Sequence, residues 1–188
     1  MITSRFEIEK IINENSIGCE LGVFKGDFSE ILIKSNKFHQ LYLVDLFHGQ
    51  IQSGDTHGNN IEILDGECLY QSVLEKFKDN TAVSILKQDS ISFLKQFPDE
   101  YFDFIYIDTT HQYTQTKNEL NIAFEKAKPN GIIAGHDYNS THFNEVCIAV
   151  DEFSKEKKIK LNLTSEDFLE TYYFYKTHES SLLKNKLK

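Results

Sequence analysis

The sequence predicts an α/β fold, a three-layer sandwich built around a mostly parallel sheet. Short apolar runs rich in Ile, Val, Leu and Tyr alternate with longer segments of helical periodicity, and this alternation is typical of strands and helices around a parallel sheet. No repeat, low-complexity tract or Pro-rich linker interrupts it, and a chain of 188 residues has the length of one domain. We therefore expect a single domain over residues 1–188.

Seven strands are expected, and the last two are close enough in sequence to form an antiparallel hairpin. They cover residues 16–23, 40–46, 82–88, 102–108, 131–137, 160–165 and 171–177. Apolar residues at helical spacing predict the helices between them. These cover residues 27–35, 67–77, 90–96, 114–127 and 144–157, and an N-terminal helix is expected within 1–15. Residues 47–66 are polar and rich in glycine, so we expect a substrate lid there, since long loops in compact domains are often functional.

Acidic residues outnumber basic ones, 29 against 20, and the net charge is −9. Because phosphate binding needs a basic face, this composition argues against a nucleic acid partner. The three cysteines, Cys19, Cys68 and Cys147, are too widely spaced for a metal finger and are typical of thiols in a reducing compartment. No apolar run approaches the length of a membrane span or a signal peptide. We expect a cytoplasmic protein that contacts neither nucleic acid nor membrane.

A glycine-containing turn follows the first expected strand. Gly22 and Gly26, just after Glu20, allow the backbone to turn sharply and to approach a ligand closely at the carboxyl edge of the sheet. The pattern ExGxxxG lacks the GxGxxG spacing of dinucleotide sites, where the backbone must accommodate a pyrophosphate. A ligand without phosphate is therefore favoured, and a nicotinamide-dependent oxidoreductase is the alternative that this spacing disfavours.

Acidic residues follow the next two strands. Asp45 lies about 20 residues beyond the glycines, where nucleoside-binding α/β folds carry the acidic residue that accepts the ribose hydroxyls. Gln88, Asp89 and Ser90 close the third strand, where a carboxylate and backbone N–H groups can bind an adenine edge. Taken singly, the glycines also fit an ordinary strand-to-helix turn, and Asp89 a helix cap. Together, at successive strand ends, these residues predict nucleoside binding.

A second polar cluster lies at the ends of two later strands. Asp108 and Asp137 end strands expected to be neighbours, so their carboxylates should converge at the carboxyl edge. Two adjacent carboxylates repel each other unless a proton or a cation lies between them, which predicts a divalent cation with a preference for oxygen ligands. His136 reaches the same ion only if the strand end is irregular, because adjacent strand residues point to opposite faces; a structural histidine is equally consistent. His111 is a candidate general base or cofactor contact, or else an exposed histidine at a helix entry.

These segments together resemble the class I S-adenosylmethionine-dependent methyltransferases, in particular the macrocin-type sugar O-methyltransferases. The strings that carry the resemblance, between residues 16 and 153, are ELGVFKGDFS, YLVDLF, QDS, YIDTTHQY and PNGIIAGHDY. The resemblance implies a Rossmann-like fold with a seven-stranded sheet and a C-terminal antiparallel hairpin. It also implies that S-adenosylmethionine is the cofactor. The residues expected to hold this cofactor are Glu20, Gly22, Lys25, Ser29, Asp45, Gln88, Asp89, Ser90 and Asp108.

The resemblance further implies metal-assisted methylation of a hydroxyl on a small molecule such as a sugar or polyol. Asp108, His136 and Asp137 would hold the divalent cation, Mg or Mn. Thr110 stands where relatives with a catalytic Asp carry a second acidic residue, and a threonine hydroxyl is no base at neutral pH. We therefore expect His111 and Asp108 to be the catalytic residues, with His111, three residues after Asp108, accepting the proton. A homodimer is expected from the resemblance alone.

Two other classes of protein fit the same residues. A nucleoside-binding protein without turnover would also retain the cofactor residues, and Thr110 is compatible with such a loss. A metal-dependent hydrolase would use the same Asp and His cluster, but no nucleophile motif accompanies it.

Overall fold

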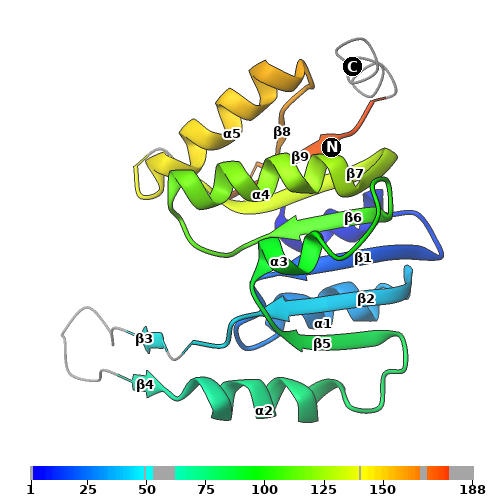
Figure 1. Ribbon diagram of the computed structural model, residues 1–188, viewed down its shortest axis with the longest axis vertical. Coiled ribbons are helices and arrows are strands. Elements are labelled where there is room, and N and C mark those ends of the chain that lie inside the picture. Colours follow the sequence, from blue (N-terminus) through cyan, green and yellow to red (C-terminus); the bar gives the residue numbers. More distant parts are fainter. Residues whose placement is uncertain (1, 49, 53–61, 140, 166–168, 178–188) are drawn as a thin grey trace.

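The part of the chain that the structure describes, residues 2–48, 50–52, 62–139, 141–165 and 169–177 of a computed structural model, forms a seven-stranded sheet (Figure 1). Its strands are β1 (Ser16–Leu21), β2 (Phe38–Asp45), β5 (Val83–Lys87), β6 (Phe102–Ile107), β7 (Ala127–Tyr138), β8 (Asn162–Leu163) and β9 (Glu170–Tyr175). They lie in the order β5-β2-β1-β6-β7-β9-β8. The five strands from β5 to β7 in this order run parallel to one another, whereas β9 runs antiparallel to both β7 and β8. The predicted sheet and C-terminal hairpin are confirmed.

The order of the strands places a crevice at the centre of the sheet. The chain passes from β1 outward to β2 and β5, then returns to β6 on the other side of β1. Connections that leave a parallel sheet in opposite directions open a crevice at the carboxyl ends of the two central strands, which is where α/β folds bind ligands. The expected site therefore lies above β1 and β6.

Helices cover both faces of the sheet and produce two apolar cores (Figure 1). The helices are the 3₁₀ helix η1 (Arg5–Ile11) and the α-helices α1 (Asp27–Lys34), α2 (Gly66–Phe77), α3 (Ser90–Leu94), α4 (Tyr113–Lys126) and α5 (Asn144–Lys157). Helices α3, α4 and α5 pack on one face, and η1, α1 and α2 contribute to the core of the other. The predicted three-layer arrangement is confirmed.

Strand β6 shows how the sequence serves both cores. Phe104 and Tyr106 belong to the core beneath η1 and α1, whereas Ile105 and Ile107 belong to the core beneath α4 and α5. Successive side chains of a strand point to opposite faces, so the part of β6 that is buried on both sides, Phe104 to Ile107, has no charged residue.

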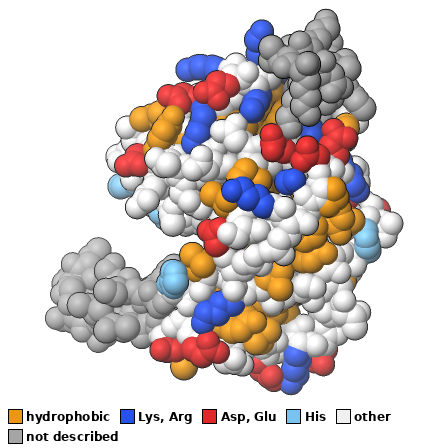
Figure 2. Space-filling view, viewed as in Figure 1, with side chains coloured by type: hydrophobic (Ala, Val, Ile, Leu, Met, Phe, Trp, Pro, Cys, Tyr) orange, Lys and Arg blue, Asp and Glu red, His pale blue; other side chains and the backbone are white. Residues whose placement is uncertain are grey.

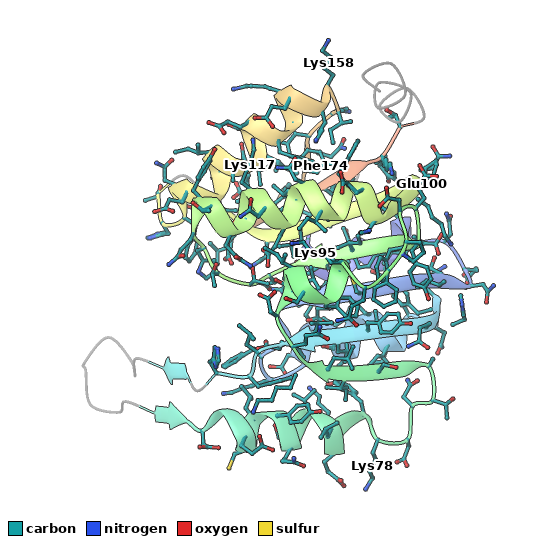
Figure 3. All side chains as sticks on the ribbon, in the orientation of Figure 1. Lys78, Lys95, Glu100, Lys117, Lys158 and Phe174 are labelled. Carbon is teal, nitrogen blue, oxygen red and sulfur yellow. The ribbon has the colours of Figure 1, made fainter. Side chains whose placement is uncertain are left out.

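Helix α5 is attached to β9 and α4 by aromatic and ionic contacts. Phe174 of β9, labelled in Figure 3, packs against Phe153 of α5 with ring centroids 5.3 Å apart. Lys117 of α4 reaches across to α5, where its Nζ lies 2.8 Å from Glu156 Oε1 and 3.4 Å from Glu152 Oε2. Exposed ion pairs of this kind contribute little stability, so the apolar contact is the main attachment.

The ends of several elements differ from the expected ones, since β7 begins at Ala127 rather than at residue 131 and β8 covers only Asn162–Leu163. Two differences are larger. The expected N-terminal helix is a short 3₁₀ helix, Arg5–Ile11, capped by Ser4. Within the expected lid, β3 (Gln50–Gln52) pairs antiparallel with β4 (Glu62–Leu64), beyond the carboxyl edge of the sheet (Figure 1). Residues 53–61 of the lid lie outside the described residues, so its role remains a prediction.

The surface agrees with the mixed charge of the sequence. Basic and acidic side chains are interspersed on the face drawn in Figure 2. Among the described residues, every helix is too short or too polar to cross a bilayer.

Removing a core ring should destabilise the fold. Phe104 is 0% exposed and lies 5.8 Å from the Phe38 ring, so Phe104→Ala should lower the free energy of unfolding by about 3–5 kcal/mol in urea titrations followed by circular dichroism. Phe6, which is 60% exposed, is the matched control, and Phe6→Ala should change it by about 0.5 kcal/mol or less. Equal losses in the two variants would contradict this account of the core.

Candidate functional site

In the turn after β1, the backbone of Gly22 lies very close to the backbone of Asp108 at the end of β6. Gly22 has a φ of +92°, and a Cβ atom built on it would lie 1.8 Å from the carbonyl oxygen of Asp108. No side chain fits in that space, and L-residues rarely adopt that φ. The ends of β1 and β6 therefore meet only because residue 22 is glycine.

Asp45, at the end of β2, fixes the conformation of the same turn. Its Oδ2 atom accepts hydrogen bonds from the backbone N–H groups of Val23 at 2.7 Å and Phe24 at 2.9 Å. Its Oδ1 atom accepts one from Phe47 N–H at 2.6 Å. The carboxylate therefore holds the glycine turn and the chain leaving β2 in one arrangement.

Two adjoining cavities among the described residues open along this edge of the sheet. The first, cavity A, has a volume of about 210 Å³ and is lined by Asp45, Gln88, Asp89 and Ser90, among others. The second, cavity B, has a volume of about 460 Å³. Its lining includes Arg5, Glu20, Lys25, His111, His136 and Asp137. Gly22, Phe24, Asp108 and Thr109 line both, so the cavities meet above the Gly22 turn.

Glu20 is a buried carboxylate beside cavity B. Ser29 Oγ of α1 donates a hydrogen bond to Glu20 Oε2 at 2.6 Å. Burial raises the pKa of Glu20 to about 8, although the Ser29 hydrogen bond and the charge of Arg5 oppose this shift. At neutral pH Glu20 is therefore mostly protonated in the free protein.

Arg5 projects from η1 into cavity B. It is the only arginine in the sequence, and its Nη2 lies 3.3 Å from Asp108 Oδ2. The guanidinium carbon lies 4.5 Å from the ring centroid of Phe28 and 5.9 Å from that of Tyr106. A planar guanidinium suits both a carboxylate and aromatic rings better than an ammonium does. Burial raises the pKa of Asp108, and the charge of Arg5 opposes that shift.

Asp108, His111 and Asp137 form the densest group of metal-ligating side chains among the described residues. Their donor atoms all lie within 4.8 Å of one another. His111 Nε2 lies 2.7 Å from Asp137 Oδ2, and this hydrogen bond raises the pKa of His111. Burial raises the pKa of Asp137, but its hydrogen bonds to His111 and His136 outweigh burial and leave the pKa below its usual range. The group can hold a cation or a proton.

The end of β7 is irregular where Asp137 lies. Asp137 has a φ of +62°, and the pairing of β7 with β9 shifts register between Gly135 and Tyr138. Both His136 and Asp137 consequently line cavity B, and His136 Nδ1 lies 3.1 Å from Asp137 Oδ1. His136 is nevertheless outside the group of donors within 4.8 Å, which contains His111 in its place.

Every residue predicted to hold the cofactor lies at or just beneath this edge. Glu20, Gly22, Lys25 and Asp108 line cavity B, and Asp45, Gln88, Asp89 and Ser90 line cavity A. Ser29 lies behind Glu20. Asp89 also caps α3 by accepting a hydrogen bond from Ser92 N–H at 2.7 Å. Their roles remain predictions.

Several site residues were missed by sequence reasoning. Arg5 and Phe24 line the cavities, and so do Thr109 and Gln115, but none belongs to the quoted motifs as a ligand. The one signal for Arg5 is composition, because a single arginine in a lysine-rich chain marks a position that needs a guanidinium.

Known structures share this fold at low sequence identity. N-methyltransferase NodS from Bradyrhizobium japonicum WM9 is 15% identical, with a TM-score of 0.62 over 93% of this chain and 92% of NodS. Spermidine synthase from Thermotoga maritima is 11% identical, with a TM-score of 0.64 over 93% of this chain and 60% of the synthase. CurJ carbon methyltransferase is 11% identical, with a TM-score of 0.61 over 93% and 54% of the two chains. Such likeness shows a common fold.

The sequence itself identifies the family. No curated protein sequence matches the chain. The profile of the methyltransferase domain matches residues 19–138, which run from β1 to the end of β7 and include the residues lining both cavities from Glu20 to Asp137. Because this match covers more than half of the chain, the chain belongs to the methyltransferase domain family.

Proposed function

We propose that this methyltransferase transfers a methyl group from S-adenosylmethionine to a hydroxyl group of a small molecule, such as a sugar or polyol, with the help of a divalent cation. The observation that carries the proposal is the group formed by Asp108, His111 and Asp137, whose donor atoms lie within 4.8 Å beside the cavity that adjoins the expected nucleoside site. Because the chain belongs to the methyltransferase domain family, methyl transfer is favoured over the alternative of a nicotinamide-dependent oxidoreductase.

S-adenosylmethionine is the methyl donor of this enzyme, and NodS, with the same fold, has been solved with its demethylated product, S-adenosylhomocysteine. We place the adenosine end in cavity A, where Asp45 would accept the ribose hydroxyls and Asp89 and Ser90 would meet the base. The amino acid end then belongs in cavity B, near Glu20 and Lys25. This placement brings the two ends of the donor to the junction at Gly22.

The residues around Asp137 fit a divalent cation. The two carboxylates offer oxygen ligands, which suit Mg, and an imidazole beside Asp137, from His136 or His111, would also suit Mn. When bound, the ion would orient the acceptor and lower the pKa of its hydroxyl. Asp137 is already ionised at neutral pH, because its hydrogen bonds to His111 and His136 hold its pKa low.

His111 is the group best placed to accept the hydroxyl proton. Its Nε2–H donates to Asp137, which leaves Nδ1 to act as the base. The ring packs at 4.2 Å from that of Phe143, so it is held in one orientation, and the side chain is still 45% exposed to solvent. Asp137 stabilises the protonated imidazole, which favours the transfer.

Either His136 or His111 could be the third ligand of the cation, and His111 can act as the base only if His136 is that ligand. The family resemblance implies His136 as the third ligand, whereas the distances group His111 with the carboxylates. Titration of metal-free protein with MnCl₂ separates these roles. If His136 is the ligand, His136→Ala should weaken Mn binding about tenfold or more and His111→Ala should not. The reverse result would assign His111 to the ion and remove it as the base.

Loss of His111 should reduce turnover without loss of donor binding. Positioned general bases contribute about 10²-fold or more, so His111→Ala should lower kcat by that order while the Kd for S-adenosylhomocysteine stays within about threefold. His39, an exposed histidine bonded to the carbonyl of Asn15, is the matched control, and His39→Ala should change neither value. Unchanged turnover in His111→Ala would place the proton transfer elsewhere.

Metal dependence and the acceptor atom can be measured together. Conversion of S-adenosylmethionine to S-adenosylhomocysteine should require Mg or Mn, stop with EDTA, and occur with polyol or sugar acceptors. The panel should include amines, because NodS, with the same fold, is an N-methyltransferase. Turnover with amines alone, or full turnover in EDTA, would argue against the proposal.

Donor binding should release a proton from Glu20. Glu20 has a pKa of about 8 in the free protein, and a cationic donor favours its ionised form, so binding at pH 7 should release a fraction of one proton. Calorimetry with S-adenosylmethionine in phosphate and Tris buffers should show buffer-dependent heats at pH 7 and much smaller differences at pH 9.5. Glu20→Gln should abolish the dependence, and buffer-dependent heats that persist in this variant would contradict the assignment.

The same residue should shape the pH dependence of stability. Its pKa in the folded protein, about 8, is above the value of 4.5 for an unperturbed glutamate, so the folded state binds more protons than the unfolded state between these pH values. The contribution of Glu20 to the free energy of unfolding therefore falls as the pH rises from about 4.5 through about 8. Urea titrations of Glu20→Gln should show a shallower fall over that range than wild-type protein, and parallel curves would contradict the burial of the charge.

A further inference from the structure

A buried carboxylate lies behind cavity A and plays no part in the mechanism above. Glu119 of α4 is 0% exposed. It accepts hydrogen bonds from Ser90 Oγ, from Thr109 Oγ1 at 2.7 Å and from Gln115 Nε2 at 2.9 Å. These three donors come from the start of α3, the end of β6 and the first turns of α4, and all three line cavity A.

The three donors favour the ionised form of this carboxylate. Burial raises the pKa of Glu119 overall, and the hydrogen bonds from Ser90, Thr109 and Gln115 limit that rise by stabilising the ionised form. Two carboxylate oxygens offer about four lone pairs and no hydrogen, so an ionised Glu119 can only accept. Every polar hydrogen that faces it must therefore point toward it.

This arrangement fixes the hydrogen-bonding polarity of the cavity wall. Ser90 and Thr109 each have one hydroxyl hydrogen, and each donates that hydrogen to Glu119. Gln115 Nε2 uses its hydrogens on Glu119 and on Ser90 Oγ, the latter at 3.3 Å. The groups that these three side chains leave for a ligand are hydroxyl lone pairs and the amide carbonyl oxygen, which are all acceptors. Asp89, on the same wall, is an acceptor as well.

We propose that Glu119 is a positioning residue that makes the part of the cavity A wall formed by the side chains of Ser90, Thr109 and Gln115 accept hydrogen bonds only, and that the enzyme thereby favours a 6-amino purine over a 6-oxo purine. An amino group at position 6 donates two hydrogens into this part of the wall. A carbonyl oxygen at the same position meets only lone pairs there, and the N1–H of a 6-oxo purine is then the one hydrogen that this edge of the base can donate. A site built for a hydrogen-bonding group rejects an analogue that lacks the group more strongly than a hydrophobic pocket does. The inference rests on the proposed placement of adenosine in cavity A, and it is independent of the metal and of the acceptor.

Two ligands test this inference by calorimetry: S-adenosylhomocysteine and its deaminated analogue, S-inosylhomocysteine. Wild-type protein should bind the adenine form about tenfold or more tightly than the inosine form, since an unpaired buried polar group costs roughly that factor. Glu119→Gln keeps the shape of the side chain but adds an N–H₂ group, which forces one neighbour to accept and turns its hydrogen toward the cavity. The affinity ratio in this variant should fall to about threefold or less.

A matched control variant distinguishes an effect on the hydrogen bonding of cavity A from a general loss of charge on α4. Glu125 lies near the end of the same helix, α4, and Glu125→Gln removes the same charge, so its affinity ratio should equal that of wild-type protein. A purely structural role for Glu119 would weaken both ligands equally and leave the ratio unchanged, which would overturn the inference.

A separate variant tests whether adenosine binds in cavity A. Asp45→Asn should weaken both ligands by a similar factor, because the ribose is common to them. If Asp45→Asn binds both ligands as wild type does, the placement in cavity A is wrong and the inference falls with it. If Asp45→Asn weakens both ligands while Glu119→Gln keeps the wild-type ratio, only the role of Glu119 is refuted.

Discussion

The contact between Gly22 and the backbone of Asp108 determines where the rest of the site lies. A Cβ atom at residue 22 would lie 1.8 Å from the Asp108 carbonyl oxygen, so the ends of β1 and β6 approach as closely as two backbones can. Asp45 holds the turn in place through the N–H groups of Val23 and Phe24. Both cavities open from this junction and share Gly22 and Asp108 in their walls. The position of cavity A beside cavity B therefore depends on one glycine between two central strands.

The second chamber concentrates charge that the chain itself compensates. Asp108 is paired with Arg5 at 3.3 Å, and Asp137 with His111 at 2.7 Å. Buried carboxylates without such partners would take up protons instead. The cation proposed at Asp108 and Asp137 would therefore act alongside the positive charge of Arg5 and the hydrogen bond from His111. The N-terminal 3₁₀ helix that carries Arg5 is thus a structural part of cavity B.

The sequence was most informative where the chemistry of a residue and its place in a strand agreed. Alternating apolar runs predict the sheet, and the strand ends in the sequence are enough to place Glu20, Asp45 and Asp108 at one edge. Contacts between distant segments could not be predicted in this way. Glu119 has the pattern of an ordinary helix residue, and only folding brings it under Ser90 and Thr109. Likewise, the positive φ of Asp137 brings it to His111, and no sequence period encodes such an irregular strand end.

A crystal structure of the enzyme with S-adenosylhomocysteine and Mn tests the account most directly, because it locates nucleoside and ion in one experiment. The account predicts the adenine ring in cavity A, the ribose hydroxyls on Asp45, and an anomalous peak for Mn bound by Asp108 and Asp137. An adenine ring outside cavity A, or Mn bound away from these two carboxylates, would contradict it.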